Sequence, residues 1–382
     1  MRNVAKLALL ALLMSAIQAV PASAAVPPRP QAERFIVVLD EGVPARGLAS
    51  QAMAATGGRV GFIYEHSING FTIEMPAGAA FGLSRMPGVA FIEPDLEVSI
   101  AAQTESTGYD RTDADLNPSG ADYSAVDIAI IDTGIWYDTA AGVSHEDLKL
   151  RYVTDCTGAI FYPLFGGCSA GGVDGHGHGT HVAGIAAARD NGIGSRGIAP
   201  GATLWSFKAL DDSGSGYLGS ILAAVDLVAE NSDQIEVANM SLSFVGESQA
   251  LVDAIDAAVA KGVVFVVAAG NDSHDASLSM PSAVDSAITV SSVSDYDGLP
   301  GGLAAATCYS DTDDELAIYS NFGSKVDIAA PGTCIYSTWL NNTYHTASGT
   351  SMASPTVAGA VARYLHDNNF DLTTGAEVAA VR

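Results

Sequence analysis

The sequence is poor in basic residues, and charged residues of either sign are sparse. Lysine and arginine together number 17, against 43 aspartates and glutamates, so the formal net charge over 382 residues is −26. This deficit argues against nucleic acid as a partner, because binding to phosphates needs positive charge. Charged residues make up only 16% of the chain and hydrophobic residues 48%, which argues against long disordered stretches and predicts a sizeable buried core.

Most of the excess acid lies after residue 100, where the chain holds 35 acidic and 10 basic residues. An acidic surface of this kind fits a soluble protein outside the cell and would favour the binding of cations. Solubility alone explains it equally well.

Long apolar runs are scarce, and the one at the N-terminus has the features of a targeting signal. Arg2 and Lys6 precede an apolar stretch at residues 7–17, and Ala-Ser-Ala at 22–24 is a small-residue cleavage site. The stretch is too short to span a membrane comfortably. We therefore predict a secretory signal peptide at residues 1–24, a secreted extracellular protein, and no stable membrane insertion.

Cysteine is rare, with four residues and no Cys-x-x-Cys spacing of the kind found in redox or zinc sites. Export permits disulfides, and four cysteines allow three pairings. We favour pairing between sequence neighbours, which joins Cys156 to Cys168 and Cys308 to Cys334. The alternative is that some of the four stay reduced and buried.

The pattern of apolar residues predicts two folded parts. Residues 25–33 are a proline-rich linker, and a β-α-β-β-α-β alternation over 34–98 predicts a small α+β domain of ferredoxin-like type. The periodicity stops near residue 100. We therefore divide the chain into the signal peptide, a small domain at 25–100 and a large domain at 101–382.

The large domain alternates apolar strands with helices. Strands are predicted at 126–131, 203–209, 236–242 and 263–268, and helices at 179–189, 217–230, 248–260 and 352–366. Continuous apolar strands between helices predict an α/β fold with a doubly wound, mostly parallel sheet. Sites in such sheets form at the carboxyl ends of the strands.

The first candidate catalytic segment is a strand that ends in a carboxylate. Residues 128–131 are apolar and deliver Asp132 to the strand end, followed by Thr-Gly. The signal is weak by itself, because an aspartate at a strand end is most often a turn or helix cap.

The second segment is Asp-Gly-His-Gly-His-Gly-Thr-His at 174–181. It places His178 at a glycine-lined helix start, where the helix N-terminus disfavours a positive imidazole and predicts a neutral, basic ring. One alternative is a histidine without chemistry. Another is a zinc site, which the H-x-H-x-x-H spacing of His176, His178 and His181 suggests.

The third segment, Gly-Thr-Ser-Met-Ala-Ser-Pro at 349–355, places Ser351 at a turn before a helix. Pro355 is expected in the first helical turn, where its missing N–H removes no hydrogen bond. A serine in this position is most often a helix N-cap, and both Ser351 and Ser354 are candidates for that role.

Together the three segments supply the groups that nucleophilic serine chemistry needs: a carboxylate, a base and a hydroxyl. Their order along the chain is that of subtilisin. The stretches IIDTGI, HGHGTHVAGI and GTSMASPTVAG resemble the three active-site signatures of the subtilase family, and the resemblance runs from about residue 107 to the end. It implies a serine endopeptidase that acts through an acyl-enzyme, with Asp132 as orienting carboxylate, His178 as general base and Ser351 as nucleophile.

A fourth segment, at 263–271, resembles the family strand that ends in the oxyanion asparagine. The resemblance implies that Asn271 and the Ser351 backbone N–H stabilise the tetrahedral intermediate. The alternative is a polar turn residue after a strand.

Other segments resemble the substrate-binding edges of the family, between which an extended peptide pairs its backbone. One edge consists of Ser213, Gly214, Ser215 and Gly216, and the other of Ser241, Leu242 and Ser243. Ser243 stands where the family usually has glycine. The first specificity pocket is expected to be walled by Ala268, Ala269 and Gly270. No acidic residue is evident there, which predicts broad specificity with a small or apolar residue before the scissile bond.

Residues 189–195 resemble the calcium loop of subtilases, which offers hard oxygen ligands. The resemblance implies a structural, non-catalytic Ca²⁺ ion. Its expected ligands are Gln103, Asp147, Arg189, Asn191, Ile193 and Ser195. A second, weaker site is expected at Asp327, and an ordinary Asn-Gly turn at 191–192 is the alternative to the first.

The small domain resembles the inhibitory propeptide of the family, through Phe-Ile-Val-Val-Leu at 35–39, Asn-Gly-Phe at 69–71 and Ile-Glu-Pro-Asp at 92–95. This implies a domain that assists folding and whose tail fills the active site until it is cut. A separate binding module is the alternative. The mature enzyme is expected to be a monomer that acts on proteins and peptides.

Two other functions compete with an active endopeptidase. One is a catalytically inactive subtilase-like binding or processing module, and the other is a metal-dependent hydrolase that uses the HGHGTH cluster. All four reacting positions are intact, which argues against the first. The second would leave Ser351 and Asn271 unexplained.

Overall fold

A computed structural model describes residues 32–40, 42–64, 69–94, 107–112, 114, 121–157, 168–370 and 372–382. The chain divides into two compact units, Met1–Ser99 and Ile100–Arg382. The predicted signal peptide at 1–24 and the candidate ligand Gln103 lie outside the described residues.

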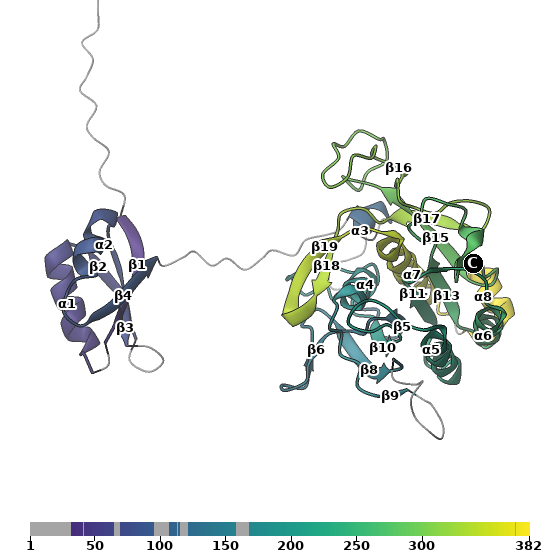
Figure 1. Ribbon diagram of the computed structural model, residues 1–382, viewed down its shortest axis with the longest axis horizontal. Helices are drawn as coiled ribbons and strands as arrows, with labels where there is room; N and C mark the ends of the chain where they lie inside the picture. Colours follow the sequence, from purple (N-terminus) through teal and green to yellow (C-terminus); the bar gives the residue numbers. More distant parts are fainter. Residues whose placement is uncertain are drawn as a thin grey trace, which may run out of the picture. The chain divides into compact units, whose positions relative to one another are not determined.

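The first unit consists of an antiparallel sheet and two helices (Figure 1). Its elements are β1 (Ala32–Leu39), α1 (Ala45–Thr56), β2 (Arg59–Tyr64), β3 (Gly70–Pro76), α2 (Ala77–Leu83) and β4 (Val89–Pro94). They follow one another in the predicted β-α-β-β-α-β order, and the strands lie in the order β2-β3-β1-β4. Val37, Phe71 and Ile73 are buried together with Leu48 and Ala52 of α1, so this unit has a hydrophobic core of its own.

The second unit is built on a nine-stranded sheet in the order β16-β15-β13-β11-β5-β10-β8-β9, with β17 beside β15. These strands are β5 (Asp127–Asp132), β8 (Lys149–Asp155), β9 (Ser169–Ala170), β10 (Thr203–Lys208), β11 (Val237–Met240), β13 (Val264–Ala268), β15 (Ile288–Ser294), β16 (Glu315–Leu316) and β17 (Ile328–Pro331). All neighbouring strands are parallel except the short β9 and β16. The predicted doubly wound, mostly parallel sheet is confirmed.

The two central strands explain why the sequence shows continuous apolar runs. Every residue of β5 and of β10 is buried, because helices cover both faces of the sheet. β5 lies between β10 and β11, so the strand order reverses at this point. The carboxyl end of β5, where sites form in such sheets, carries Asp132.

Two helix pairs cover the sheet. α4 (His178–Ala187) packs against α7 (Thr350–Asp367), and α5 (Leu218–Glu230) packs against α6 (Gln249–Ala260), which also contacts α8 (Gly375–Val381). Figure 1 shows the two pairs on different sides of the sheet. α4 begins with His178, which contacts Asp132, and Ser351 at the start of α7 lines the same cavity as His178.

α7 begins at Thr350, two residues earlier than predicted, and this changes the role of Pro355. Pro355 lies in the second turn, not the first, so the Ser351 carbonyl four residues before it has no intrahelical donor. The Ser241 hydroxyl donates to that carbonyl at 2.8 Å instead. The prediction that Pro355 removes no hydrogen bond is therefore wrong: one is removed, and a side chain replaces it.

Shorter elements connect the main ones. They are α3 (Thr107–Arg111), β6 (Tyr137–Asp138) with β7 (Val143–Ser144), β12 (Phe244–Val245) with β14 (Ser279–Met280), the hairpin of β18 (Ile335–Trp339) and β19 (Thr343–Ala347), and two 3₁₀ turns at Ala276–Leu278 and Leu340–Asn342. Disulfides join Cys156 to Cys168 and Cys308 to Cys334, the two pairs that we favoured. In the described part of the chain, no helix combines the length and the apolar character needed to cross a membrane.

Candidate active site

The site begins with a buried carboxylate bonded to a histidine. Asp132 ends β5 and is fully buried, and its Oδ1 lies 2.7 Å from Nδ1 of His178, the first residue of α4. The same oxygen accepts from the Thr133 N–H at 2.7 Å. A Cβ on Gly179 would lie 2.2 Å from the Gly134 carbonyl oxygen, so only glycine lets α4 start this close to β5. The pair is therefore fixed by the backbone of two elements.

A second buried carboxylate, Asp174, organises the start of α4. Its Oδ1 accepts from the Thr133 hydroxyl and from the backbone N–H groups of His176 and Gly177, at 2.8 to 2.9 Å. Its Oδ2 accepts from the N–H and the hydroxyl of Thr180, at 3.0 and 2.6 Å. We did not assign a role to Asp174 from the sequence, although an aspartate shortly before a predicted helix start is a typical helix-capping residue.

The pKa of His178 is shifted in the opposite direction to the one expected for a histidine at a helix N-terminus. Burial by itself lowers the pKa of His178, but the charge of Asp132 and its hydrogen bond to the ring, together with the charge of Asp174, outweigh burial. The pKa of His178 is therefore raised above its ordinary value of 6.5. The site stabilises the imidazolium form, as a group that accepts a proton during a reaction requires.

The other two histidines of the segment do not share a metal centre with His178. His181 is fully buried, and its Nε2 lies 3.1 and 3.0 Å from the carbonyl oxygens of Ile335 and His345. Burial lowers the pKa of His181 to about 4, so the ring is neutral and structural. His176 is exposed, with its ring centroid 6.3 Å from that of His178. Among the described residues, none of the three belongs to a group of side chains spaced for a metal ion, which argues against the metal-dependent hydrolase.

Ser351 is the second residue of α7 and lines the same cavity as His178. Its hydroxyl donates to the Ser241 carbonyl oxygen at 3.2 Å. As a first-turn residue it has no intrahelical acceptor for its N–H. Ser354 is fully buried and donates to Asn239 Oδ1 at 2.7 Å, so of the two candidate serines only Ser351 faces the cavity.

Asn271 follows β13 and lines the cavity from the side of α7. Its Oδ1 accepts from the N–H and from the hydroxyl of Thr350, at 2.8 and 3.0 Å. Because both bonds engage the oxygen, the side-chain amide is held with its NH₂ group available to a ligand. Ser351 N–H lies one residue further along the same helix turn.

The cavity has a volume of about 650 Å³. Its lining includes Ser213, Gly214, Ser215 and Gly216 on one wall, Ser241, Leu242 and Ser243 on another, and the side chains of Leu210, Leu218, Ile221 and Phe244. No residue of this lining is acidic. The remaining predicted wall residues, Ala268, Ala269 and Gly270, are buried behind this lining rather than part of it.

Comparison of this sequence with known proteins identifies the family to which it belongs. Residues 124–381 match the subtilase family, peptidase S8. The chain belongs to the subtilase family.

The relatives of this subtilase are named as proteases. It is 36% identical to an alkaline protease of Alkalihalobacillus alcalophilus over 76% of this chain and 67% of that protein. It is 36% identical to an extracellular serine proteinase of Thermus sp. (strain Rt41A), over 88% of this chain and 77% of that protein. It is 38% identical to subtilisin DY of Bacillus licheniformis, over 69% of this chain and 85% of that protein. The solved structure of a cold-adapted subtilisin-like serine proteinase superposes with a TM-score of 0.55 at 34% identity, covering 69% of this chain and 82% of that one. This subtilase is a serine-type endopeptidase that acts on protein or peptide substrates.

Three of the candidate calcium ligands of this subtilase, Arg189, Asn191 and Ser195, form hydrogen bonds with Asp147. The carboxylate is fully buried and accepts from Asn191 Nδ2 at 2.8 Å, the Ser195 N–H at 3.1 Å and the Tyr344 hydroxyl at 2.8 Å. The Asp147 carbonyl oxygen accepts from the Arg189 N–H at 2.8 Å. Burial raises the pKa of Asp147 despite these three hydrogen bonds, as expected for a buried charge that a cation would stabilise.

These residues fit a calcium ion, with one adjustment. Asn191 turns its NH₂ group toward Asp147 and its Oδ1 toward the Ile193 N–H at 3.1 Å, so the side-chain amide must turn over to offer oxygen. Asp327, by contrast, forms an ion pair with Arg382 at 2.6 Å and accepts from the Thr289 N–H. Its charge is already balanced, so the structure gives no support to a second calcium site there.

Proposed function

We propose that this endopeptidase is secreted and cleaves peptide bonds through an acyl-enzyme on Ser351, with His178 as general base and Asp132 as orienting carboxylate. The observation that carries the assignment is the 2.7 Å bond between Asp132 and His178, together with the cavity that His178 and Ser351 both line. The three side chains come from distant parts of the chain, and each stands at the end or the start of an element.

The reaction follows from the hydrogen bonds of the site. The Ser351 hydroxyl, which donates to Ser241 O in the free site, turns to His178 Nε2 when a substrate is bound. Its oxygen attacks the substrate carbonyl carbon while Nε2 takes the proton, and the buried Asp132 stabilises the imidazolium. The C–N bond then breaks as His178 returns the proton to the leaving amine, and water releases the acyl group by the same steps in reverse.

The oxyanion that forms in the tetrahedral intermediate needs donors that are already in place. Asn271 Nδ2 supplies one, because Thr350 holds the Asn271 oxygen on the opposite side of the amide. The Ser351 N–H, at the positive end of α7, supplies the second.

Specificity follows from the lining of the cavity. We propose that the substrate lies extended between residues 213–216 and 241–243 and places a small or apolar side chain in the cavity. The absence of acidic residues from that lining disfavours a basic side chain, and Leu210, Leu218 and Ile221 favour apolar ones. Ser243, in place of the family's glycine, adds a side chain to one edge. A set of peptides that differ only at the residue before the scissile bond tests this preference.

Secretion and maturation are further parts of the proposal. The features of residues 1–24 support export, and the first unit, with its own core, supports a propeptide that folds as a module, assists folding and inhibits until it is cut. We propose that the mature enzyme is a monomer. N-terminal sequencing of the secreted protein and its mass in solution test these points.

The metal of the proposal is a structural Ca²⁺ ion. Asp147, the side-chain oxygen of Asn191, and the carbonyl groups of Arg189, Ile193 and Ser195 would hold it, with Gln103 as a further ligand from outside the described residues. The ion would supply positive charge against the buried Asp147 carboxylate and would take no part in the chemistry.

The decisive experiment combines labelling with an activity measurement. A serine-directed phosphonate is expected to modify Ser351 alone and to stop hydrolysis of a protein substrate in proportion. Ser351→Ala is expected to remain unlabelled and inactive and to leave the full chain uncut. Hydrolysis that persists in the fully labelled enzyme would remove Ser351 from the nucleophile role.

A further inference from the structure

The connection between β15 and β16, residues 295–314, brings acidic side chains from its two ends to one point. One carboxylate oxygen each of Asp295, Asp297 and Asp313 lie within 4.8 Å of one another. Asp295 and Asp297 follow the end of β15, and Asp313 precedes the start of β16. Three negative charges at this spacing repel one another unless a cation lies between them.

Burial makes the repulsion worse. Asp295 and Asp313 are buried, and the Asp295 side chain has no exposed surface. Within the described part of the chain, the Oδ2 atom of Asp295 is buried and has no hydrogen-bond partner. Arg111 Nη1 is 3.5 Å from this oxygen, beyond a good hydrogen bond, because it is bonded to Asp314 at 2.6 Å. The cluster thus contains a buried carboxylate oxygen that, among the described residues, accepts no hydrogen bond and shares the nearby cation Arg111 with Asp314.

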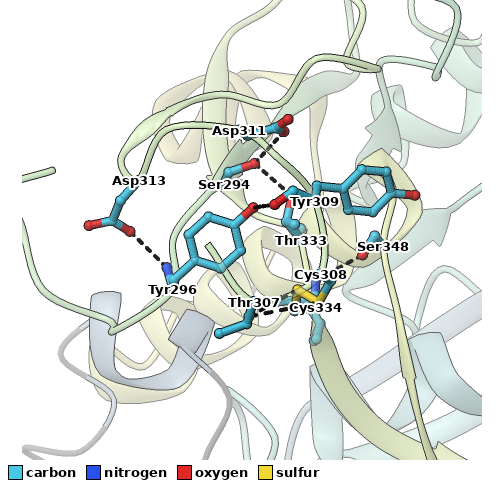
Figure 2. Close-up of a disulfide and its surroundings, with 12 residues drawn as sticks. Ser294, Tyr296, Thr307, Cys308, Tyr309, Asp311, Asp313, Thr333, Cys334 and Ser348 are labelled. Atoms are coloured by element: carbon cyan, nitrogen blue, oxygen red, sulfur yellow. Dashed lines mark hydrogen bonds between the residues drawn. A yellow bond between two sulfur atoms is a disulfide. The ribbon is translucent and has the colours of Figure 1, made fainter. Parts of the chain in front are cut away.

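The backbone orients the carboxylates as a built site would. Asp313 accepts from the N–H groups of Tyr296 at 2.8 Å and Ala304 at 3.0 Å, and Figure 2 draws the first of these bonds. Asp295 Oδ1 accepts from the N–H groups of Gly298 at 2.7 Å and Asp297 at 3.3 Å, and Asp297 Oδ1 accepts from the Leu299 N–H at 2.9 Å. Asp295 Oδ2 accepts no hydrogen bond from the described residues, and each Asp313 oxygen and Asp297 Oδ1 keep a second lone pair after one, so every carboxylate still has a position for a metal.

The sequence of the loop explains how two aspartates face one point. Asp-Tyr-Asp-Gly at 295–298 turns sharply at Gly298, whose φ of +74° is costly for other residues. A Cβ there would lie 2.7 Å from the Asp110 Cβ of α3, so the turn also requires the absence of a side chain. Asp295 and Asp297 therefore project from a tight, fixed loop.

We propose that Asp295, Asp297 and Asp313 bind a Ca²⁺ ion, at a site separate from the loop at 189–195. All candidate ligands are carboxylate oxygens, which hard cations prefer, and the cluster contains no nitrogen or sulfur ligand. The ion would join the two ends of the 295–314 connection. The middle of the same connection is already fixed by the Cys308–Cys334 disulfide, which Figure 2 shows beside Thr307 and Ser348.

The test is a calorimetric titration of Ca²⁺ into the full chain carrying Ser351→Ala, which prevents self-digestion, after removal of metal with a chelator. Asp297→Asn is the main variant, because Asp297 is exposed and its carboxylate accepts from the nearby Leu299 N–H, so the fold does not depend on it. We expect it to lose one bound Ca²⁺, or to bind that ion at least about tenfold more weakly. Asp313→Asn is expected to have the same effect.

Two controls separate this site from others. Asp233→Asn makes the same charge change at an exposed position and is expected to bind as the parent does. Asp147→Asn is expected to weaken the binding of a different Ca²⁺ ion. The losses of Ca²⁺ binding caused by Asp147→Asn and by Asp297→Asn should therefore be additive. If Asp297→Asn binds as many Ca²⁺ ions as the parent with the same affinities, the proposed site does not exist.

Discussion

At the scale of single residues, the candidate catalytic residues could be named from the sequence, but the electrostatics around His178 could not be predicted. Asp132, His178 and Ser351 each stood in a recognisable segment, and the structure places the first two in contact. The helix N-terminus predicted a neutral His178, yet its pKa is raised, because two buried carboxylates from separate segments act on the ring. Only the fold shows how close those carboxylates lie.

The pH dependence of activity follows from this shift. His178 must be neutral to take the Ser351 proton, so kcat/KM should fall as the pH decreases through a value above 6.5. Asp132→Asn removes the largest contribution that raises the pKa, and the acid limb of its residual activity should move to lower pH. A sensitive fluorogenic peptide measured across the acid range checks both profiles. An acid limb that stays in place in Asp132→Asn would contradict this account of the shift.

Asn271 provides a second prediction at this scale. Asn271→Leu keeps a side chain of similar size but removes the amide NH₂ that faces the cavity. We expect kcat to fall by about 10² to 10³ while KM changes little, because the lost bond forms mainly in the transition state. The kinetics of one peptide substrate, compared with wild type, give both constants. An unchanged kcat would remove Asn271 from the oxyanion role.

At the scale of elements, apolar runs located the central strands, but polar strands escaped detection. β5 and β10 were predicted within a residue or so because all their residues are buried and at least half of each strand is apolar. β15 was not predicted, although it is almost entirely buried, because it contains three serines. The fold provides partners for the serine hydroxyls: Ser292 Oγ is hydrogen-bonded to the Tyr319 hydroxyl, and Ser294 Oγ donates to Asp311. Partners so distant in sequence cannot be read from a local pattern.

The contact between β11 and α7 gives a prediction about an element. The Ser241 hydroxyl donates to the Ser351 carbonyl, which Pro355 leaves without a helical donor. Ser241→Ala should therefore lower the free energy of unfolding by about 1–3 kcal/mol. Pro355→Ala restores a backbone N–H four residues after Ser351, so the double variant should lose less than the sum of the two single changes.

Denaturant unfolding of phosphonate-inactivated enzyme measures this coupling as a double-mutant cycle. Pro355→Ala is expected to restore only part of the stability lost in Ser241→Ala. Ser241 Oγ also accepts a hydrogen bond from Asn239 Nδ2, and Pro355→Ala does not restore that bond. Strictly additive effects would show that the Ser351 carbonyl does not depend on Ser241.

At the scale of the whole molecule, the chain has a large excess of negative charge. A cation bound at Asp147 would join segments that lie far apart in the sequence. Asp147 lies far along the chain from Asn191 and Tyr344, yet it bonds to both, and its carboxylate is buried. The unfolded chain cannot reproduce this arrangement, so Ca²⁺ that binds there stabilises the native state by mass action. The gain is about 2.7 kcal/mol at a hundredfold excess over Kd. It should be larger at low salt, where the surrounding negative charge is less screened.

The corresponding prediction concerns the gain in Tm between chelator and saturating Ca²⁺, measured on phosphonate-inactivated enzyme. Asp147→Asn should show a smaller gain than wild type, because the buried charge that attracts the ion is gone. The exposed variant Asp233→Asn should show the full gain, which rules out an effect of net charge. Because burial raises the pKa of Asp147, protons compete with calcium at this carboxylate, and the wild-type gain should shrink as the pH falls toward that pKa. If Asp147→Asn gains as much as wild type at every pH, the ion that stabilises the enzyme is bound elsewhere.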